Sequence, residues 1–176
     1  MRCQLCWGMR IFLDFEASSL NKQSYPIEVG WVSEDGGSEG HLIRPAPSWL
    51  DWDETAEAIH GISRDLLLRE GVAHDVVCAR LAKIFQDNVV YASAPSWDGH
   101  WLSMLLRAAG RPRHSLRLRD SEEAFVEAAQ AGQGPAAERI ALARKVVEAE
   151  PVVHRAVEDA WREWAIWREI SRSTVD

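Results

Sequence analysis

Two acidic residues follow an apolar run near the start of the chain. Asp14 and Glu16 come directly after Ile11, Phe12 and Leu13, a run that is typical of a buried strand. Because side chains two positions apart in a strand share a face, both carboxylates are expected to point the same way. Their repulsion and the cost of burying them favour a cation between them. Mg²⁺ prefers such oxygen ligands; the alternative is that one carboxylate faces solvent or an arginine.

Two later acidic residues extend this pattern. Asp98 follows a predicted strand over 89–93, at the kind of sheet edge where α/β sites assemble, and its position also suits a helix N-cap. Asp159 comes five residues after His154. Five residues of continuous helix rotate by roughly 140° beyond one turn, so the two side chains would not share a face. We therefore place His154 in the turn before the helix; alone, it would be interpreted as a surface histidine.

These residues resemble the DEDDh branch of the DEDD superfamily of 3′-to-5′ exonucleases, which includes RNase T, oligoribonuclease and the proofreading subunit of bacterial DNA polymerase III. The signature of that branch is D-x-E near the start, an Asp about midway and H-x-x-x-x-D near the end. The resemblance covers roughly residues 11–167 and includes the stretch over 54–62, which ends in His60-Gly61-Ile62. Residues 121–150 match no pattern of the family. The resemblance implies an RNase H-like fold.

The same resemblance implies a mechanism with two Mg²⁺ or Mn²⁺ ions, about 4 Å apart. The metal ligands would be Asp14, Glu16, Asp98 and Asp159, and His154 would be the general base, which suits its ordinary pKa of ~6.5. The expected contacts to the terminal nucleotide are Phe15, Ala17, Ser18, His60, Gly61 and Ile62. The alternative for His60-Gly61-Ile62 is a simple turn before a helix.

Composition limits the class of protein. The 176 residues carry 20 basic and 27 acidic side chains, a net charge of −7, which argues against a broad, non-specific grip on duplex DNA. The first residues contain no apolar core of signal-peptide length, and no run of about 18 apolar residues occurs, so we expect a cytoplasmic protein without a membrane span. Residues 1–8 are interpreted as an extension, in which Cys3 and Cys6 are only a weak zinc or redox signal. Residues 9–176 are interpreted as one exonuclease domain.

The pattern of apolar residues predicts an α/β protein with a mixed five-stranded sheet flanked by helices. After the first strand, further strands are expected over 27–32, 41–43, 89–93 and 116–119, with helices between them and from residue 121 onward.

Two side-chain groups are open to more than one interpretation. The basic run consists of Arg107, Arg111, Arg113, Arg117 and Arg119. We favour charged protection of an edge strand over steering of a phosphate backbone. Trp161, Trp164 and Trp167 recur on the last predicted helix; they are expected to pack in the core, and a homodimer contact is the alternative.

The resulting hypothesis is a metal-dependent exonuclease that releases nucleoside 5′-monophosphates from the 3′ ends of short single strands. RNA or oligonucleotides are favoured over DNA, although nothing in the sequence identifies a reader of the 2′-hydroxyl. The alternatives are a DNA proofreading or repair exonuclease, and a nucleic-acid-binding module that has the fold without turnover.

Overall fold

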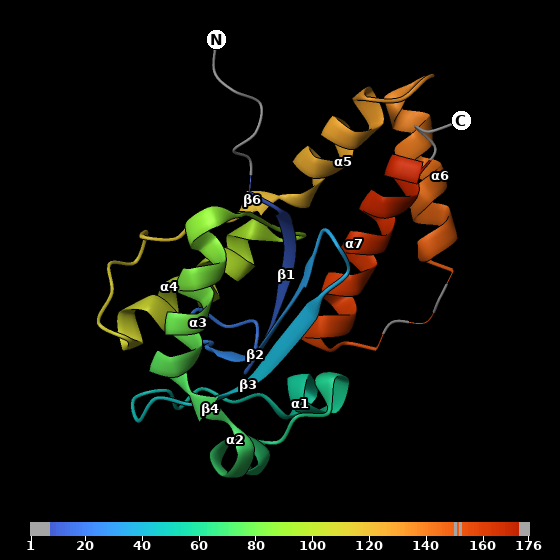
Figure 1. Cartoon of the computed structure of the whole chain (residues 1–176). Helices are drawn as coiled ribbons and strands as arrows, with labels where there is room; N and C mark the ends of the chain where they lie inside the picture. Colours follow the sequence, from blue (N-terminus) through green and yellow to red (C-terminus); the bar gives the residue numbers. More distant parts are fainter. Residues whose placement is uncertain (1–7, 150, 152, 173–176) are drawn as a thin grey trace.

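A computed structural model describes residues 8–149, 151 and 153–172 (Figure 1). The strands in this part of the chain are β1 (Arg10–Ala17), β2 (Pro26–Ser33), β3 (Ser38–Arg44), β4 (Val72–Ala73), β5 (Val89–Ala92) and β6 (Arg119–Asp120). The helices are α1 (Glu54–His60), α2 (Arg64–Glu70), α3 (His74–Asp87), α4 (Pro95–Ala108), α5 (Ser121–Gln130), α6 (Ala136–Val147) and α7 (Ala156–Arg172). Cys3 and Cys6 lie outside the described residues.

The strands form one sheet in the order β4-β3-β2-β1-β5-β6. The β1–β2 and β2–β3 pairs are antiparallel, and the β1–β5, β5–β6 and β3–β4 pairs are parallel. The predicted mixed α/β sheet is therefore confirmed, with six strands in place of five. The additional strand is β4, which pairs with only two residues at the end of β3 and lies where the sequence predicted no strand.

The predicted strand over 116–119 is only partly correct. Its pairing is confined to Arg119 and Asp120, in β6. Leu116 and Leu118 come before this strand in a loop, and they pack against the hydrophobic core without ladder hydrogen bonds. The apolar residues at alternate positions therefore lie on the side of the loop that faces the core. Such an alternation does not require strand pairing.

Helices cover both faces of the sheet (Figure 1). On one face, α3 and α4 enclose a core that includes Ile11, Leu13 and Phe15. On the other face, α5, α6 and α7 enclose a second core around Phe12. The side chains of β1 thus alternate between two cores, and β2 is buried along nearly all its length because both of its faces are covered. Within the described ranges, every helix is too short or too polar to cross a lipid bilayer.

The start of α7 lies directly on the sheet because two glycines leave room for it. A Cβ atom at Gly30 would lie 2.3 Å from the backbone nitrogen of Val157, and one at Gly40 would lie 2.4 Å from Val157 Cγ2. Gly30 is the cross-strand partner of both Asp14 and Gly40. The helix that carries Asp159 therefore begins beside Asp14.

Candidate metal centre

Three carboxylates from opposite ends of the chain meet at one point. Asp14 and Glu16 lie on the same face of β1, as the strand period predicts, and Asp159 lies in the first turn of α7. One carboxylate oxygen from each residue lies within 4.8 Å of the other two. The structure thus brings together three of the four predicted metal ligands, close enough for their oxygen atoms to bind one metal ion.

The fourth predicted ligand, Asp98, lies next to this group. Its expected role as an N-cap is wrong, because α4 already begins at Pro95, with Ala94 as the N-cap. Asp98 instead occupies the first turn of the helix and is only 1% exposed. Its Oδ2 atom is buried and has no hydrogen-bond partner in the described part of the chain. A buried carboxylate oxygen without a donor is costly unless a cation satisfies it.

The carboxylates destabilise one another's charged forms. The pKa of Asp14 lies well above its usual range, because of burial first and then the negative charge of Asp98, followed by those of Glu16, Asp159 and Glu163. Burial and the charge of Asp159 raise the pKa of Glu16 to about 7. Burial likewise raises the pKa of Asp98 to about 7 and raises that of Asp159.

These shifts are typical of acidic groups that share a site without a counterion.

Glu163 is a fifth acidic residue at this site that the sequence analysis missed. It is four residues after Asp159 and therefore lies on the same face of α7. The Ser121 hydroxyl, at the start of α5, donates a hydrogen bond to Glu163 Oε2. Burial raises the pKa of the Glu163 carboxyl, and its charge contributes to the raised pKa of Asp14 and Asp98. The helical spacing from Asp159 was the signal that could have identified it.

His154 lies in the turn before α7, as expected. It is exposed, and its φ of 51° places it in the left-handed region, where few non-glycine residues occur. Its charge lowers the pKa of Asp159, although burial dominates and the net shift of Asp159 is upward. The tight turn thus places an imidazole at the exposed side of the carboxylate group.

An ion pair between the buried Glu28 and the half-buried Arg155 fixes the direction in which α7 starts. Glu28 is 5% exposed and lies opposite Glu16 in the β1–β2 ladder. Its Oε2 atom accepts hydrogen bonds from Arg155 Nε at 2.9 Å and from the backbone N–H of Ala156 at 3.0 Å. Glu28 therefore satisfies a backbone donor at the helix N-terminus and holds the helix start over β2. The sequence analysis did not single out this pair.

The six predicted nucleotide contacts fall into two groups. Phe15, Ala17 and Ile62 belong to the hydrophobic core. The other three, Ser18, His60 and Gly61, lie in or beside the turns that follow β1 and α1.

The polar atoms of this second group are mostly engaged within the protein. The Ser18 hydroxyl donates to Asp51 at 3.2 Å, and the backbone carbonyl of Ser18 accepts from the Asp53 N–H at 3.0 Å. His60 Nδ1 accepts from the Ile62 N–H at 3.0 Å, whereas His60 Nε2 is buried and has no partner among the described residues. Gly61 is exposed, with nothing within 4 Å of an added Cβ.

The donor set fits a hard divalent cation. Asp14, Glu16 and Asp159 offer oxygen atoms close together, and the unsatisfied Oδ2 of Asp98 adds another. Mg²⁺ and Mn²⁺ bind such carboxylate sets. A bound cation would also offset the repulsion that raises these pKa values.

The fold is RNase H-like, as the sequence predicts, and it is similar to the fold of a solved exonuclease. The chain aligns with exonuclease I of E. coli in a zinc-bound complex with single-stranded DNA, at 15% identity and a TM-score of 0.69 over 96% of this chain and 40% of that chain. Complexes of the same E. coli enzyme with a dA16 and a dT13 oligonucleotide give TM-scores of 0.69 and 0.70. Their identities are 14% and 15%, over 96% and 95% of this chain and 41% of the other chain in both cases.

The likeness is structural, at low sequence identity. No protein-family model matches the chain, and a search of curated protein sequences finds no match. The chain spans only about two fifths of the length of exonuclease I.

Proposed function

We propose that this protein is a metal-dependent 3′-to-5′ exonuclease that acts on single-stranded nucleic acid, with residues 9–176 as one exonuclease domain. The observation that carries the proposal is the convergence of Asp14, Glu16 and Asp159 within 4.8 Å, beside Asp98, in an RNase H-like exonuclease fold. Structural elements far apart in the sequence supply these groups, so their convergence is a property of the fold.

The acidic residues are the proposed ligands for two Mg²⁺ or Mn²⁺ ions. Asp14, Glu16 and Asp159 would hold one ion, and Asp14 with Asp98 would hold the other. When bound, these ions would make a water molecule more acidic and stabilise negative charge on the phosphate and on the leaving 3′ oxygen. The raised pKa values of the carboxyls support this assignment, because they reflect a site with an excess of negative charge.

His154 is the proposed general base. A ring nitrogen of the neutral imidazole would accept a proton from the attacking water, and the nearby Asp159 carboxylate would stabilise the imidazolium that forms. The exposed position of His154 would then let the proton pass to bulk solvent. The same reaction would release nucleoside 5′-monophosphates one at a time.

Single-stranded DNA is the first substrate to test, since the similar structures contain DNA oligonucleotides. The preference for RNA expected from the sequence stays a prediction, as do the cytoplasmic location, the homodimer and the six nucleotide contacts. Phe15, Ala17, Ser18, His60, Gly61 and Ile62 remain the proposed surroundings of the terminal nucleotide.

The test is a cleavage assay with matched DNA and RNA single strands labelled at their 5′ ends, in the presence of Mn²⁺. We expect a ladder that shortens from the 3′ end, and a loss of at least ~100-fold in rate for Asp14→Asn. Asp65→Asn is the matched control, because Asp65 is an exposed acid in the first turn of α2. Binding of the oligomers without any shortening would contradict the proposal and favour a silent binding module.

A further inference from the structure

We propose that a basic groove along α4 binds the phosphates of a single strand on the 5′ side of the nucleotide that is cleaved. The inference rests on the proposed function for its direction, but it concerns a surface distinct from the metal centre. The groove consists of three adjoining hollows, which we call the α4 groove.

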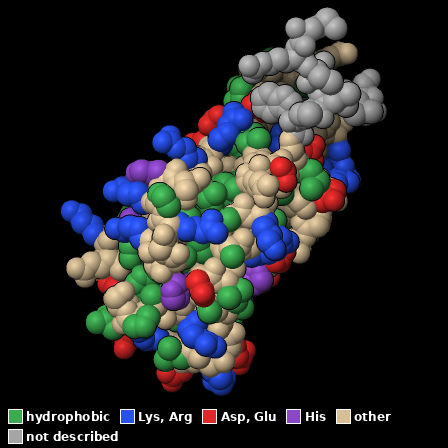
Figure 2. All heavy atoms as spheres, turned by 60° about the vertical axis from the view of Figure 1, so that its left-hand side comes forward, with side chains coloured by type: hydrophobic (Ala, Val, Ile, Leu, Met, Phe, Trp, Pro, Cys, Tyr) green, Lys and Arg blue, Asp and Glu red, His purple; other side chains and the backbone are tan. Residues whose placement is uncertain are grey.

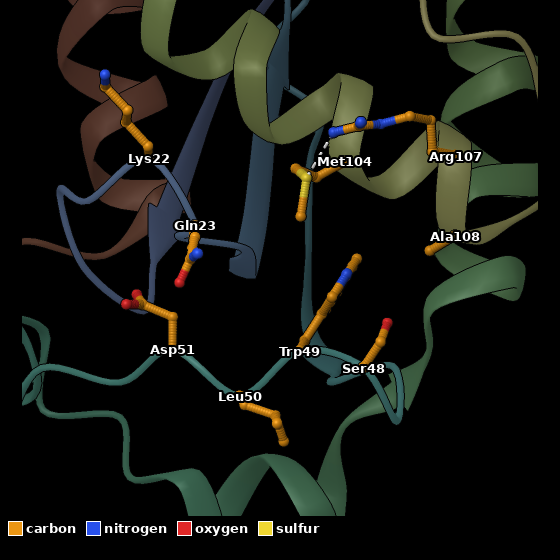
Figure 3. A pocket seen from close by; sticks show the side chains of 9 residues that line it. All are labelled: Lys22, Gln23, Ser48, Trp49, Leu50, Asp51, Met104, Arg107 and Ala108. Carbon is orange, nitrogen blue, oxygen red and sulfur yellow. Dashed lines mark hydrogen bonds between the residues drawn. The ribbon is translucent and has the colours of Figure 1, made fainter.

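The first hollow has a volume of about 640 Å³ and lies between the Lys22–Gln23 turn, residues 48–51 and the end of α4 (Figure 3). The second, of about 560 Å³, lies between α4 and the loop over residues 111–118. The third, of about 450 Å³, lies beside Trp97.

The three hollows share lining residues and so form one continuous surface. Arg107 lines the first and second hollows, Lys22 lines the first and third, and His100 lines the second and third. The groove therefore follows α4 from the first turn of the helix to its end.

The α4 groove is basic in a chain whose net charge is −7. Its lining includes four exposed cations, Lys22, Arg107, Arg113 and Arg117, and one acid, Asp51. Within the described ranges, none of the four cations forms a salt bridge. Figure 2, which brings the side of α3 and α4 forward, shows Lys, Arg and His side chains gathered on this face.

The single acid of the groove is already engaged by hydrogen-bond donors. The hydroxyls of Ser18 and Ser19 both donate to Asp51 Oδ2, at 3.2 and 2.5 Å. Phosphate binding requires cations that form no salt bridge and have little negative charge nearby, and the α4 groove has such cations.

The loop that carries two of the arginines is anchored to the protein. Ser103 Oγ, on α4, donates to the carbonyl oxygen of Arg113 at 2.9 Å. Leu116 and Leu118 pack against the core on either side of the exposed Arg117. The guanidinium groups are therefore presented from a backbone that is fixed at several points, which lowers the entropic cost of binding.

The sequence-based preference for edge protection does not explain these arginines. Residues 111–118 form no strand, so Arg113 and Arg117 lie outside the edge strand β6. Only Arg119 belongs to a strand, β6, and it forms salt bridges with Glu123 and Glu127. The structure thus favours the other interpretation, contact with a phosphate backbone, for Arg113 and Arg117.

One end of the groove lies at the turn of α4 that carries Asp98. Trp97, in the third hollow, is the residue before Asp98 and is 39% exposed. Its ring stacks on Trp101, with centroids 5.7 Å apart and an interplanar angle of 28°. An indole supported on one side and exposed on the other is suited to stacking with a base, as in other single-strand sites. A strand whose 3′ end lies at Asp98 would therefore have a stacking and phosphate-binding surface beside it.

The test is the binding of a 5′-fluorescein-labelled DNA single strand, measured by anisotropy in EDTA, where no cleavage occurs. We expect Arg113→Ala/Arg117→Ala to weaken binding at least ~10-fold and to reduce the slope of log K against log salt by roughly 1.4, since each contact with a single strand contributes about 0.7. The Arg113→Lys/Arg117→Lys variant keeps both charges and should bind nearly as the wild type does.

The matched control is Arg69→Ala/Lys145→Ala, which removes two exposed cations from α2 and α6, outside the groove. An equal loss of affinity in this control, or an unchanged affinity of Arg113→Ala/Arg117→Ala, would overturn the groove assignment. Equally tight binding of a duplex of the same length would contradict the preference for a single strand.

Cleavage separates this inference from the proposed function. With Mn²⁺, Arg113→Ala/Arg117→Ala should degrade a long single strand more slowly and should hydrolyse a dinucleotide at the wild-type rate. If the wild type cleaves both substrates and the variant does so equally well, the groove fails and the exonuclease stands. If the wild type cleaves neither but the binding differences persist, the groove stands and the proposed activity fails.

Discussion

At the scale of single residues, the acidic side chains of the candidate site repel one another. Asp14, Glu16 and Asp98 have raised pKa values because burial and neighbouring acids disfavour their charged forms. The repulsion lowers the stability of the folded protein, whereas a well-packed apolar cluster in the same place would not. A group of this kind is consistent with selection for ligand binding at the expense of stability.

Glu163 allows that repulsion to be tested without removal of a proposed metal ligand. In Glu163→Gln the side chain can still accept the Ser121 hydrogen bond, but the charge that raises the pKa of Asp14 and Asp98 is lost. We expect the melting temperature of the metal-free protein near about pH 8 to rise by about 2–4 °C, which corresponds to ~1 kcal/mol in a protein of this size. Differential scanning calorimetry measures this change.

The control for this variant is Glu138→Gln, at an exposed position on α6, which should melt as the wild type does. In the exonuclease assay we expect Glu163→Gln to lose less than about tenfold in rate, because Glu163 adjusts the site and is not a proposed ligand. A lower melting temperature would mean that Glu163 does not repel its neighbours. A loss of activity as large as that of Asp14→Asn would make Glu163 a ligand.

The sequence predicted the acidic residues of this site better than it predicted their surroundings. Asp14 and Glu16 share a face because of the strand period, and His154 had to lie outside the helix for Asp159 to reach the same place; both statements follow from local geometry. Glu28 could not be found in this way, because its importance depends on the packing of α7 against β2. Glu163 could have been found from its helical spacing.

At the scale of elements, the close approach of α7 to the sheet positions Asp159. Gly30 and Gly40 leave space for Val157, and Glu28 binds Arg155 and the Ala156 N–H. Neither contact involves a proposed metal ligand, so α7 can be displaced by changes outside the site.

Gly30→Ala tests this positioning. The added methyl group would lie 2.3 Å from the backbone nitrogen of Val157 and 2.5 Å from the carbonyl carbon of Ala156, so the helix start must shift. We expect a loss of about 1–3 kcal/mol in the free energy of unfolding, together with weaker Mn²⁺ binding. Chemical denaturation and titration calorimetry measure the two effects.

The matched control for this substitution is Gly99→Ala. Gly99 lies within α4, and nothing lies within 4 Å of an added Cβ. Alanine there should leave the protein unchanged or stabilise it by up to about 1 kcal/mol. If Gly30→Ala binds Mn²⁺ as tightly as Gly99→Ala does, the contact between α7 and the sheet does not position the metal ligands.

The elements themselves were predicted where a long periodic pattern marks them. Helices were expected between the predicted strands over 41–43 and 89–93, and the structure has α1, α2 and α3 there. The start of α4 was placed too late because Asp98 suits an N-cap, although Pro95 is the better signal for a first helical position. The two-residue strands β4 and β6 have no period to detect and depend on tertiary contact alone.

At the scale of the whole molecule, the raised pKa values make stability depend on pH. The folded protein binds protons at Glu16 and Asp98 with a pKa of about 7, whereas the unfolded chain releases them near about 4. The stability that these groups contribute is therefore present below about pH 4 and is lost as the pH rises through 7.

We accordingly expect the metal-free protein to melt at a lower temperature at about pH 8 than at about pH 5.5. Mg²⁺ or Mn²⁺ should raise the melting temperature strongly at the higher pH and little at the lower one, because the ions bind the deprotonated carboxylates. Thermal melts over a grid of pH and metal concentration measure both trends. Asp98→Asn should make the melting temperature depend less on pH and less on the metal. A melting temperature that does not change with metal concentration at any pH would rule out a metal-binding site.

The central position of β1 has a consequence for synthesis. Asp14 belongs to β1, but the helix that brings Asp159 to it, α7, follows all the strands of the described sheet and docks on β1 and β2. A ribosome therefore makes all the strands of the sheet before α7 can bring Asp159 to Asp14. Until α7 is made and docks, a nascent chain would lack Asp159 at this site and could not complete the proposed metal centre.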